Sequence, residues 1–103
     1  MASGILGQSN PTAATNTTVY TVPAGVTATA TISVTNISGD SASFNLAVSA
    51  TGTPGNSEWI MYNVQLPPSA TVERSGVVAQ TGKNFVINAS TSNVSVSVYG
   101  FEN

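Results

Sequence analysis

Cysteine and histidine are both absent from this chain of 103 residues, and charged residues make up only 6% of it. Without cysteine the chain has no disulfide and no thiolate nucleophile, and without either residue the usual zinc sites are excluded. The abundant serines have no histidine to act as their general base. These absences argue against catalysis, and we expect a protein that is not an enzyme and holds no metal or cofactor.

Charged residues of both signs are scarce, and two basic and four acidic residues give a net charge of −2. Two basic side chains cannot neutralise a run of phosphates, so nucleic acid is not an expected partner. The carboxylates are scattered over separate segments, which argues against a paired-carboxylate hydrolase. They are Asp40, Glu58, Glu73 and Glu102.

Long hydrophobic runs are missing as well. No stretch reaches the roughly 18 apolar residues of a membrane span, and no basic amphipathic helix suggests binding to a membrane surface. The first residues, MASGILGQSNP, contain neither a basic residue nor a long apolar run. We therefore expect no secretory signal and no membrane partner, and synthesis in a cytoplasm.

Alternation of apolar and hydroxyl side chains is the dominant pattern of the chain. In the segment ATATISV, Ala28, Ala30, Ile32 and Val34 alternate with threonine and serine. A period of two indicates a strand with one buried face. Similar patterns, separated by turn signals, predict strands at residues 17–22, 27–36, 43–49, 59–66, 71–74, 77–79, 85–89 and 94–101.

These seven or eight short strands, with no helical periodicity between them, predict an all-β fold. At this length the chain forms one domain. We expect an antiparallel β-sandwich over residues 17–103, with immunoglobulin-like or jelly-roll connectivity. Residues 1–16 contain only two large apolar residues among small and polar ones, and are expected to form an extended N-terminal arm.

Six residues are candidates for contact with a partner: Ile5, Leu6, Trp59, Met61, Tyr99 and Phe101. The first two are the apolar pair of the expected arm, which either frays or tethers the protein to a neighbouring subunit. The other four are expected on the strand face opposite the aliphatic side chains. There they would stack on a sugar, fill a pocket of a partner, or be covered by the protein itself.

The hydroxyl row opposite Ile32 admits two interpretations. Thr29, Thr31, Ser33 and Thr35 form a regular ladder, which suits ice binding or amyloid-like stacking. Threonine also has a high β propensity and forms neutral cross-strand pairs. We favour the second interpretation, an ordinary neutral sheet surface.

Several segments, taken in order, resemble one family along nearly the whole chain. They are residues 6–8 (LGQ), 16–25 (NTTVYTVPAG), 34–36 (VTN), 49–54 (SATGTP), 72–76 (VERSG) and 89–102 (ASTSNVSVSVYGFE). Together they resemble small β-sandwich virion proteins of tailed bacteriophages, which are common in phages of marine bacteria and cyanobacteria.

The resemblance implies a non-enzymatic structural subunit located in the virion. Such a subunit would bind major capsid or tail proteins, and head decoration, neck and tail positions are all compatible with the resemblance. Low charge and outward-facing aromatic side chains add the expectation of a homo-oligomer, specifically a homotrimer. The alternative function is a receptor- or glycan-binding module of a tail fibre, in which Trp59 would contact the sugar.

Overall fold

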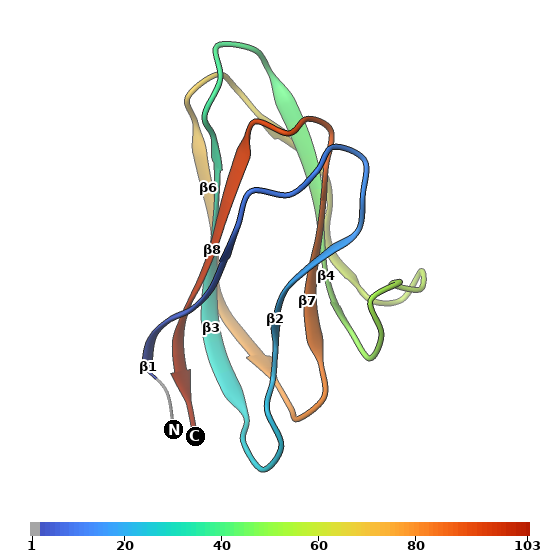
Figure 1. Ribbon diagram of the computed structural model, residues 1–103, viewed down its shortest axis with the longest axis vertical. Helices are drawn as coiled ribbons and strands as arrows, with labels where there is room; N and C mark the ends of the chain where they lie inside the picture. Colours follow the sequence, from blue (N-terminus) through green and yellow to red (C-terminus); the bar gives the residue numbers. More distant parts are fainter. Residues whose placement is uncertain (1–2) are drawn as a thin grey trace.

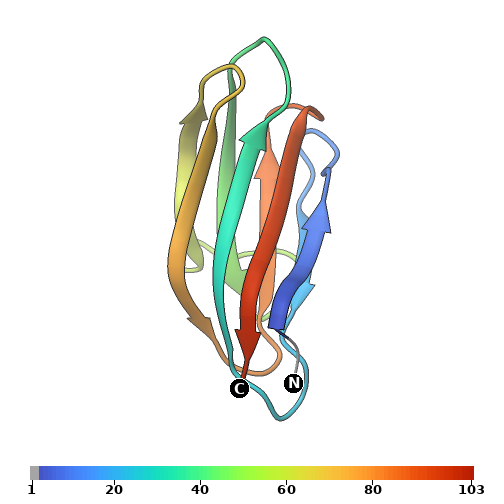
Figure 2. The ribbon, with the colours of Figure 1, turned by 90° about the vertical axis from the view of Figure 1, so that its left-hand side faces the viewer.

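The computed structural model describes residues 3–103, which form eight β-strands and contain no helix. The strands are β1 (Ser3–Ser9), β2 (Thr17–Thr21), β3 (Ala28–Asn36), β4 (Ala42–Ser49), β5 (Trp59–Leu66), β6 (Thr71–Ala79), β7 (Asn84–Ala89) and β8 (Val94–Glu102). They form two four-stranded sheets packed face to face (Figures 1 and 2). The prediction of an antiparallel β-sandwich is confirmed.

The strand pairs are nested along the chain. β1 pairs with β8, β2 with β7, β3 with β6 and β4 with β5, all antiparallel. Pairing of β3 with β8 and of β4 with β7 completes the sheets, whose orders are β1-β8-β3-β6 and β2-β7-β4-β5. This is the order of an eight-stranded jelly roll. The structure thus decides between the two connectivities that the sequence left open.

The core lies between the sheets and follows the alternation seen in the sequence. β3 buries every second residue, and β8 does so from Val94 to Val98. The opposite sheet contributes larger side chains, including Phe44, Leu46 and Phe85, all nearly inaccessible to solvent. Burying a side chain of this size contributes about 1.5–3 kcal/mol, so the unbroken alternation of β3 fixes which of its faces points inward.

Part of the expected N-terminal arm, residues 1–16, forms a strand in the structure. Ser3–Ser9 is an edge strand of the sandwich, hydrogen-bonded to β8. A Cβ added to Gly7 would collide with the backbone oxygen of Val19 on β2, so the glycine allows the two sheets to approach closely at this corner. This strand cannot be recognised from the sequence, because the strand has no apolar alternation and its partner β8 lies at the far end of the chain.

The two short strands expected at 71–74 and 77–79 are one continuous strand, β6. Ala30 pairs with Val77 and Ile32 with Arg74, so β6 has one more residue than β3 over this interval. Gly76 has a φ of 72° and accommodates the extra residue in a β-bulge. The bulge shifts the apolar alternation, so the alternating pattern breaks at a point where the strand itself continues.

One buried amide joins two turns at the same end of the sandwich. Nδ2 of Asn36 donates to the carbonyl oxygens of Asp40 at 2.6 Å and Leu66 at 3.1 Å. Its Oδ1 accepts from the backbone nitrogen of Ser38 at 3.0 Å. Because a buried amide without partners is costly, these bonds fix the β3–β4 turn against the end of β5.

Candidate binding surfaces

The neighbouring residues Ile5 and Leu6 of β1 point in opposite directions. Leu6 is half-buried and packs against the core, while Ile5 is 58% exposed. Leu6 therefore helps to hold β1 onto the sandwich. Of the pair, only Ile5 lies on the surface.

Ile5 belongs to an apolar patch on the outer face of the β1-β8-β3-β6 sheet. It pairs with Tyr99 of β8, and Thr29 of β3 has Phe101 on one side and Val78 of β6 on the other. Phe101 is 49% and Val78 63% exposed. Cross-strand partners share a face of the sheet, so Ile5, Val78, Tyr99 and Phe101 form one surface, hereafter the apolar patch.

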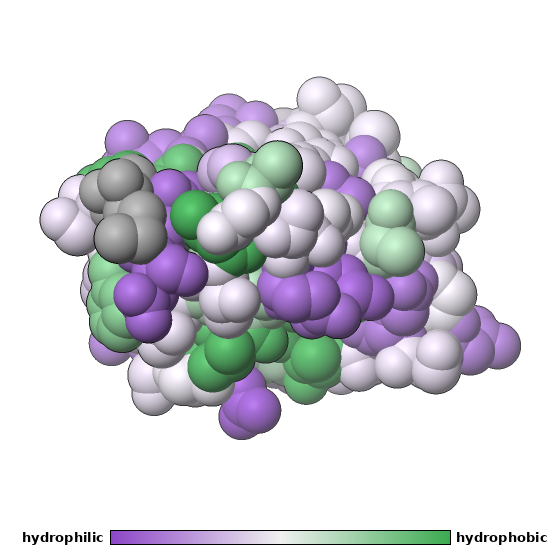
Figure 3. All heavy atoms as spheres, turned by 90° about the horizontal axis from the view of Figure 1, so that it is seen from below, coloured by the Kyte–Doolittle hydropathy of each residue, from purple (hydrophilic) through white to green (hydrophobic). Residues whose placement is uncertain are grey.

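The apolar patch lies toward the end of the molecule where β1 begins and β8 ends. Figure 3 looks at that end and shows apolar side chains exposed between polar ones. Val78 was missed in the sequence because its neighbour Val77 fits the core pattern, and Val77 is in fact the buried member of the pair. The members of the patch thus come from β1, β8 and β6, with Thr29 of β3 between Phe101 and Val78.

Tyr99 also makes a hydrogen bond from this patch. Its hydroxyl donates a short hydrogen bond to Oε2 of Glu73 on β6. The bond raises the pKa of Tyr99 above its ordinary value. It also spans β3, which lies between β8 and β6 in the sheet, and so restrains the Tyr99 side chain across the outer face.

Met61 does not lie on the outward face that the sequence predicts for both Trp59 and Met61. Met61 is half-buried and packs against the core, whereas Ile60 is 38% and Tyr62 68% exposed. Phe44 pairs with Val64 but Leu46 pairs with Met61, so β5 has an extra residue between these pairs. This bulge reverses the alternation of β5 and turns Tyr62 outward.

The bulge of β5 is stabilised by a side chain of β4. Asn63 has a φ of 51°, a left-handed conformation that asparagine tolerates better than most residues. Its backbone nitrogen donates to Oδ1 of Asn45 at 2.6 Å. The amide of Asn45 thus takes the place of the ladder partner that the bulge removes.

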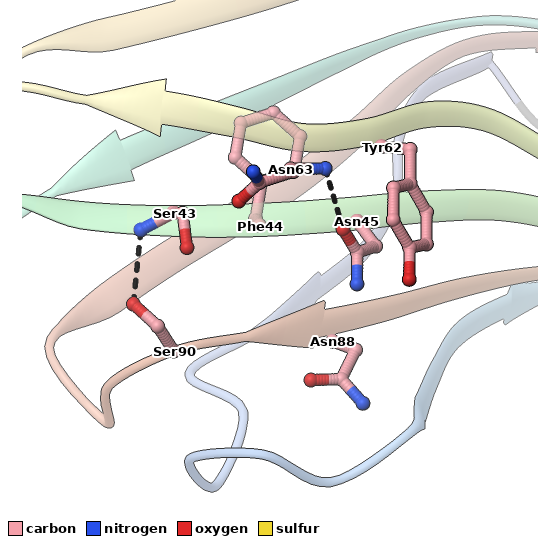
Figure 4. A pocket seen from close by; sticks show the side chains of 7 residues that line it. All are labelled: Ser43, Phe44, Asn45, Tyr62, Asn63, Asn88 and Ser90. Carbon is pink, nitrogen blue, oxygen red and sulfur yellow. Dashed lines mark hydrogen bonds between the residues drawn. The ribbon is translucent and has the colours of Figure 1, made fainter.

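A shallow pocket of about 350 Å³ lies beside this bulge, on the outer face of the β2-β7-β4-β5 sheet. Figure 4 shows Tyr62 and Asn45 side by side, with Asn88 of β7 facing them across the sheet. The lining residues are Ser43, Phe44, Asn45, Tyr62, Asn63, Asn88 and Ser90, none of them charged. Sequence analysis missed this pocket, since only the bulge brings Tyr62 to it.

The ring of Tyr62 is supported by Trp59. The two rings pack edge to face, with centroids 5.8 Å apart and an interplanar angle of 70°. Trp59 is half-buried, so the larger aromatic residue backs the smaller and more exposed one. The sequence singled out Trp59 as the sugar contact, whereas the structure presents Tyr62 to solvent.

Glu58 orders the loop that leads to Trp59. Its carboxylate accepts hydrogen bonds from the backbone nitrogen of Gly55 at 2.8 Å, the hydroxyl of Ser49 at 2.8 Å and the backbone nitrogen of Ala50 at 3.2 Å. These bonds, that of Gly55 first, lower the pKa of Glu58 below its ordinary value. An ionised Glu58 therefore closes the loop between β4 and β5.

No protein-family model matches this chain, and no significant match was found among curated proteins or solved structures. The resemblance to virion proteins of tailed phages therefore stays a prediction. Within residues 3–103 no helix is long and apolar enough to cross a membrane.

Proposed function

We propose that this protein is a non-enzymatic structural subunit of a bacteriophage virion, where it binds the capsid or tail surface and stabilises it. The apolar patch is the observation that supports this proposal best. Its exposed members Ile5, Val78 and Phe101 would be removed from water by docking onto another virion protein. Each buried CH₂ group contributes about 0.8 kcal/mol to such a contact.

The chemistry of the surface supports the same function. The surroundings of the patch are rich in hydroxyl groups, with Thr29 and Thr31 between the apolar side chains. Covering neutral hydroxyls costs less than covering ions, which must lose their hydration. Jelly rolls are found in viral capsid proteins and in lectins. This analogy concerns the fold alone and agrees with the proposal without identifying a partner.

We also propose self-association, with a homotrimer as the expected assembly. Each sheet ends in two edge strands, β1 and β6 in one and β2 and β5 in the other. Unprotected edges invite pairing with other chains, and only six side chains of the protein are charged. A second copy pairing at an edge would protect it. Light scattering at tens of micromolar is expected to give three times the monomer mass, and a monomer would contradict the homotrimer.

Incorporation into particles tests the structural function directly. Particles assembled with the wild-type chain should contain it in a fixed copy number, measured by quantitative mass spectrometry of purified virions. The double variant Ile5→Ser, Phe101→Ser should be incorporated in at least about tenfold lower amount, because its docking removes less apolar surface from water.

Ile37→Ser is the matched control for this experiment. Ile37 is 60% exposed, but it follows the opposite end of β3 from the patch. This variant should be incorporated like the wild type. The proposal fails if purified virions lack the wild-type protein, or if the double variant and the control are incorporated equally.

A second candidate function is a receptor- or glycan-binding tail-fibre module. The specific observation in its favour is the uncharged pocket beside Tyr62, on the sheet that does not carry the apolar patch.

A further inference from the structure

We propose that the pocket beside the β5 bulge binds a neutral saccharide, with Tyr62 as the stacking residue and Asn45 and Asn88 as the hydrogen-bonding residues. This inference specifies the second candidate function and does not depend on the structural one. The outer faces of the two sheets point in opposite directions, so a subunit docked through the apolar patch would leave the pocket free (Figure 2).

The aromatic surface is the first requirement for sugar binding, and Tyr62 provides it. Its side chain is 68% exposed, the largest exposed fraction of any large hydrophobic residue in the described chain. An exposed ring with fixed orientation offers apolar contact to the C–H face of a pyranose at little entropic cost. Trp59 restrains the ring through the edge-to-face contact.

The polar groups of the pocket are arranged as one donor and one acceptor. Oδ1 of Asn45 accepts from the bulge nitrogen of Asn63, which leaves its Nδ2 as a donor. Nδ2 of Asn88 donates to Oδ1 of Asn16 at 3.0 Å, which leaves its own Oδ1 as an acceptor. The neighbouring bonds therefore fix the orientation of both amides before a ligand arrives.

This pair suits two adjacent sugar hydroxyls. Asn45 and Asn88 are direct cross-strand partners of β4 and β7, which places their Cβ atoms about 4.5–5.5 Å apart. One hydroxyl of the ligand would accept from Asn45 and its neighbour would donate to Asn88. Ser43 and Ser90, which join the same strands by a 2.9 Å hydrogen bond, add hydroxyl groups at the far end of the pocket.

The chemistry of the pocket also limits the class of ligand. None of its lining residues carries a charge, so nothing there would compensate the desolvation of a sialic acid or a sulfate. Its volume is near the lower limit for small-molecule sites. The ligand class is therefore a neutral sugar unit, bound in an open site with millimolar affinity, which becomes useful when several copies act together.

An NMR titration of the isotope-labelled full chain tests this inference. The probes are cellobiose, maltose and lactose, with sialyllactose as the charged comparison. At least one neutral disaccharide should shift the backbone amides of the lining residues in a saturable manner. Tyr62→Ala should weaken this binding roughly tenfold or more, while Tyr62→Phe retains the ring and the affinity.

Asn88→Ala is the second variant, because it removes the acceptor without touching the aromatic ring. It should also weaken binding, and both substituted residues lie outside the core, so the remaining spectrum should stay that of a folded sandwich. The inference is overturned if no neutral sugar shifts the pocket amides, if Tyr62→Ala binds like the wild type, or if sialyllactose binds more tightly. None of these results would affect the incorporation experiment.

Discussion

The hydroxyl of Tyr20 on β2 donates a hydrogen bond of 2.6 Å to Oε2 of Glu102 at the end of β8. The bond joins the two sheets near the C-terminus, since β2 and β8 belong to different sheets. Tyr20 is almost fully buried and packs edge to face on Phe85, with ring centroids 5.6 Å apart. A polar contact thus closes one side of an otherwise apolar core.

Tyr20→Phe should lower the free energy of unfolding by about 1–2 kcal/mol at neutral pH, because it removes a hydrogen bond to a charged acceptor. Urea denaturation measures the change. Tyr62→Phe is the matched control, since it removes the hydroxyl of an exposed tyrosine and should change stability by less than about 0.5 kcal/mol. Equal effects of the two substitutions would contradict the importance of the Tyr20–Glu102 bond.

The same contact makes a prediction for alkaline solution. Burial, followed by the bond to Glu102, raises the pKa of Tyr20 well above its ordinary value. Above pH ~10, where a tyrosine in the unfolded chain loses its proton, the folded state binds more protons, so stability falls as pH rises. The decline should be smaller in Tyr20→Phe, and the raised pKa of Tyr99 accounts for part of what remains.

Acid should weaken the β4–β5 loop through Glu58. Because its pKa is lowered in the folded state, the unfolded chain binds more protons as pH falls below ~4.3. The stabilisation by Glu58 is therefore complete above that pH and is lost as pH falls through the folded pKa. The fluorescence of Trp59, the single tryptophan, should report the change.

Two variants test this assignment. Glu58→Gln should reduce the acid dependence of stability, because it cannot ionise. Ser49→Ala removes one hydrogen bond to the carboxylate and should move the fluorescence transition to higher pH. A transition unchanged by both substitutions would show that Glu58 does not control the loop.

Gly7→Ala tests whether β1 is an integral strand. The added methyl group would collide with the backbone oxygen of Val19, and such overpacking costs about 1–3 kcal/mol. Gly39→Ala is the control, because its Cβ would meet nothing within 4 Å. Urea denaturation should show a loss for the first variant alone, whereas a free arm would make both substitutions neutral.

The sequence predicts this fold well where strands alternate without interruption. Spacing alone predicted that Val94, Val96 and Val98 belong to the core, and all three are fully buried. No pattern indicated strand β1, whose pairing with β8 depends on residues at the opposite end of the chain. Local pattern carries no information about such a partner.

The candidate binding surfaces were harder to predict than the strands. Tyr99 and Phe101 lie on an outer face as expected, because β8 keeps its alternation up to them. Met61 and Tyr62 exchange the expected faces, because an extra residue at Asn63 reverses the alternation there, whereas Trp59 contacts the outward-facing Tyr62. A bulge of this kind depends on the tertiary contact with Asn45, which periodicity cannot show.

The pairing of β1 with β8 also determines how the protein would respond to mechanical force. Ser3 at the start of β1 pairs with Phe101 near the end of β8, so β1 begins where β8 ends, at one end of the sandwich (Figure 1). Tension applied between the termini would load the β1–β8 hydrogen bonds one after another, as in a zipper. β1 would separate from β8 one pair at a time, whereas a tether through a single terminus would leave the β1–β8 hydrogen bonds without load.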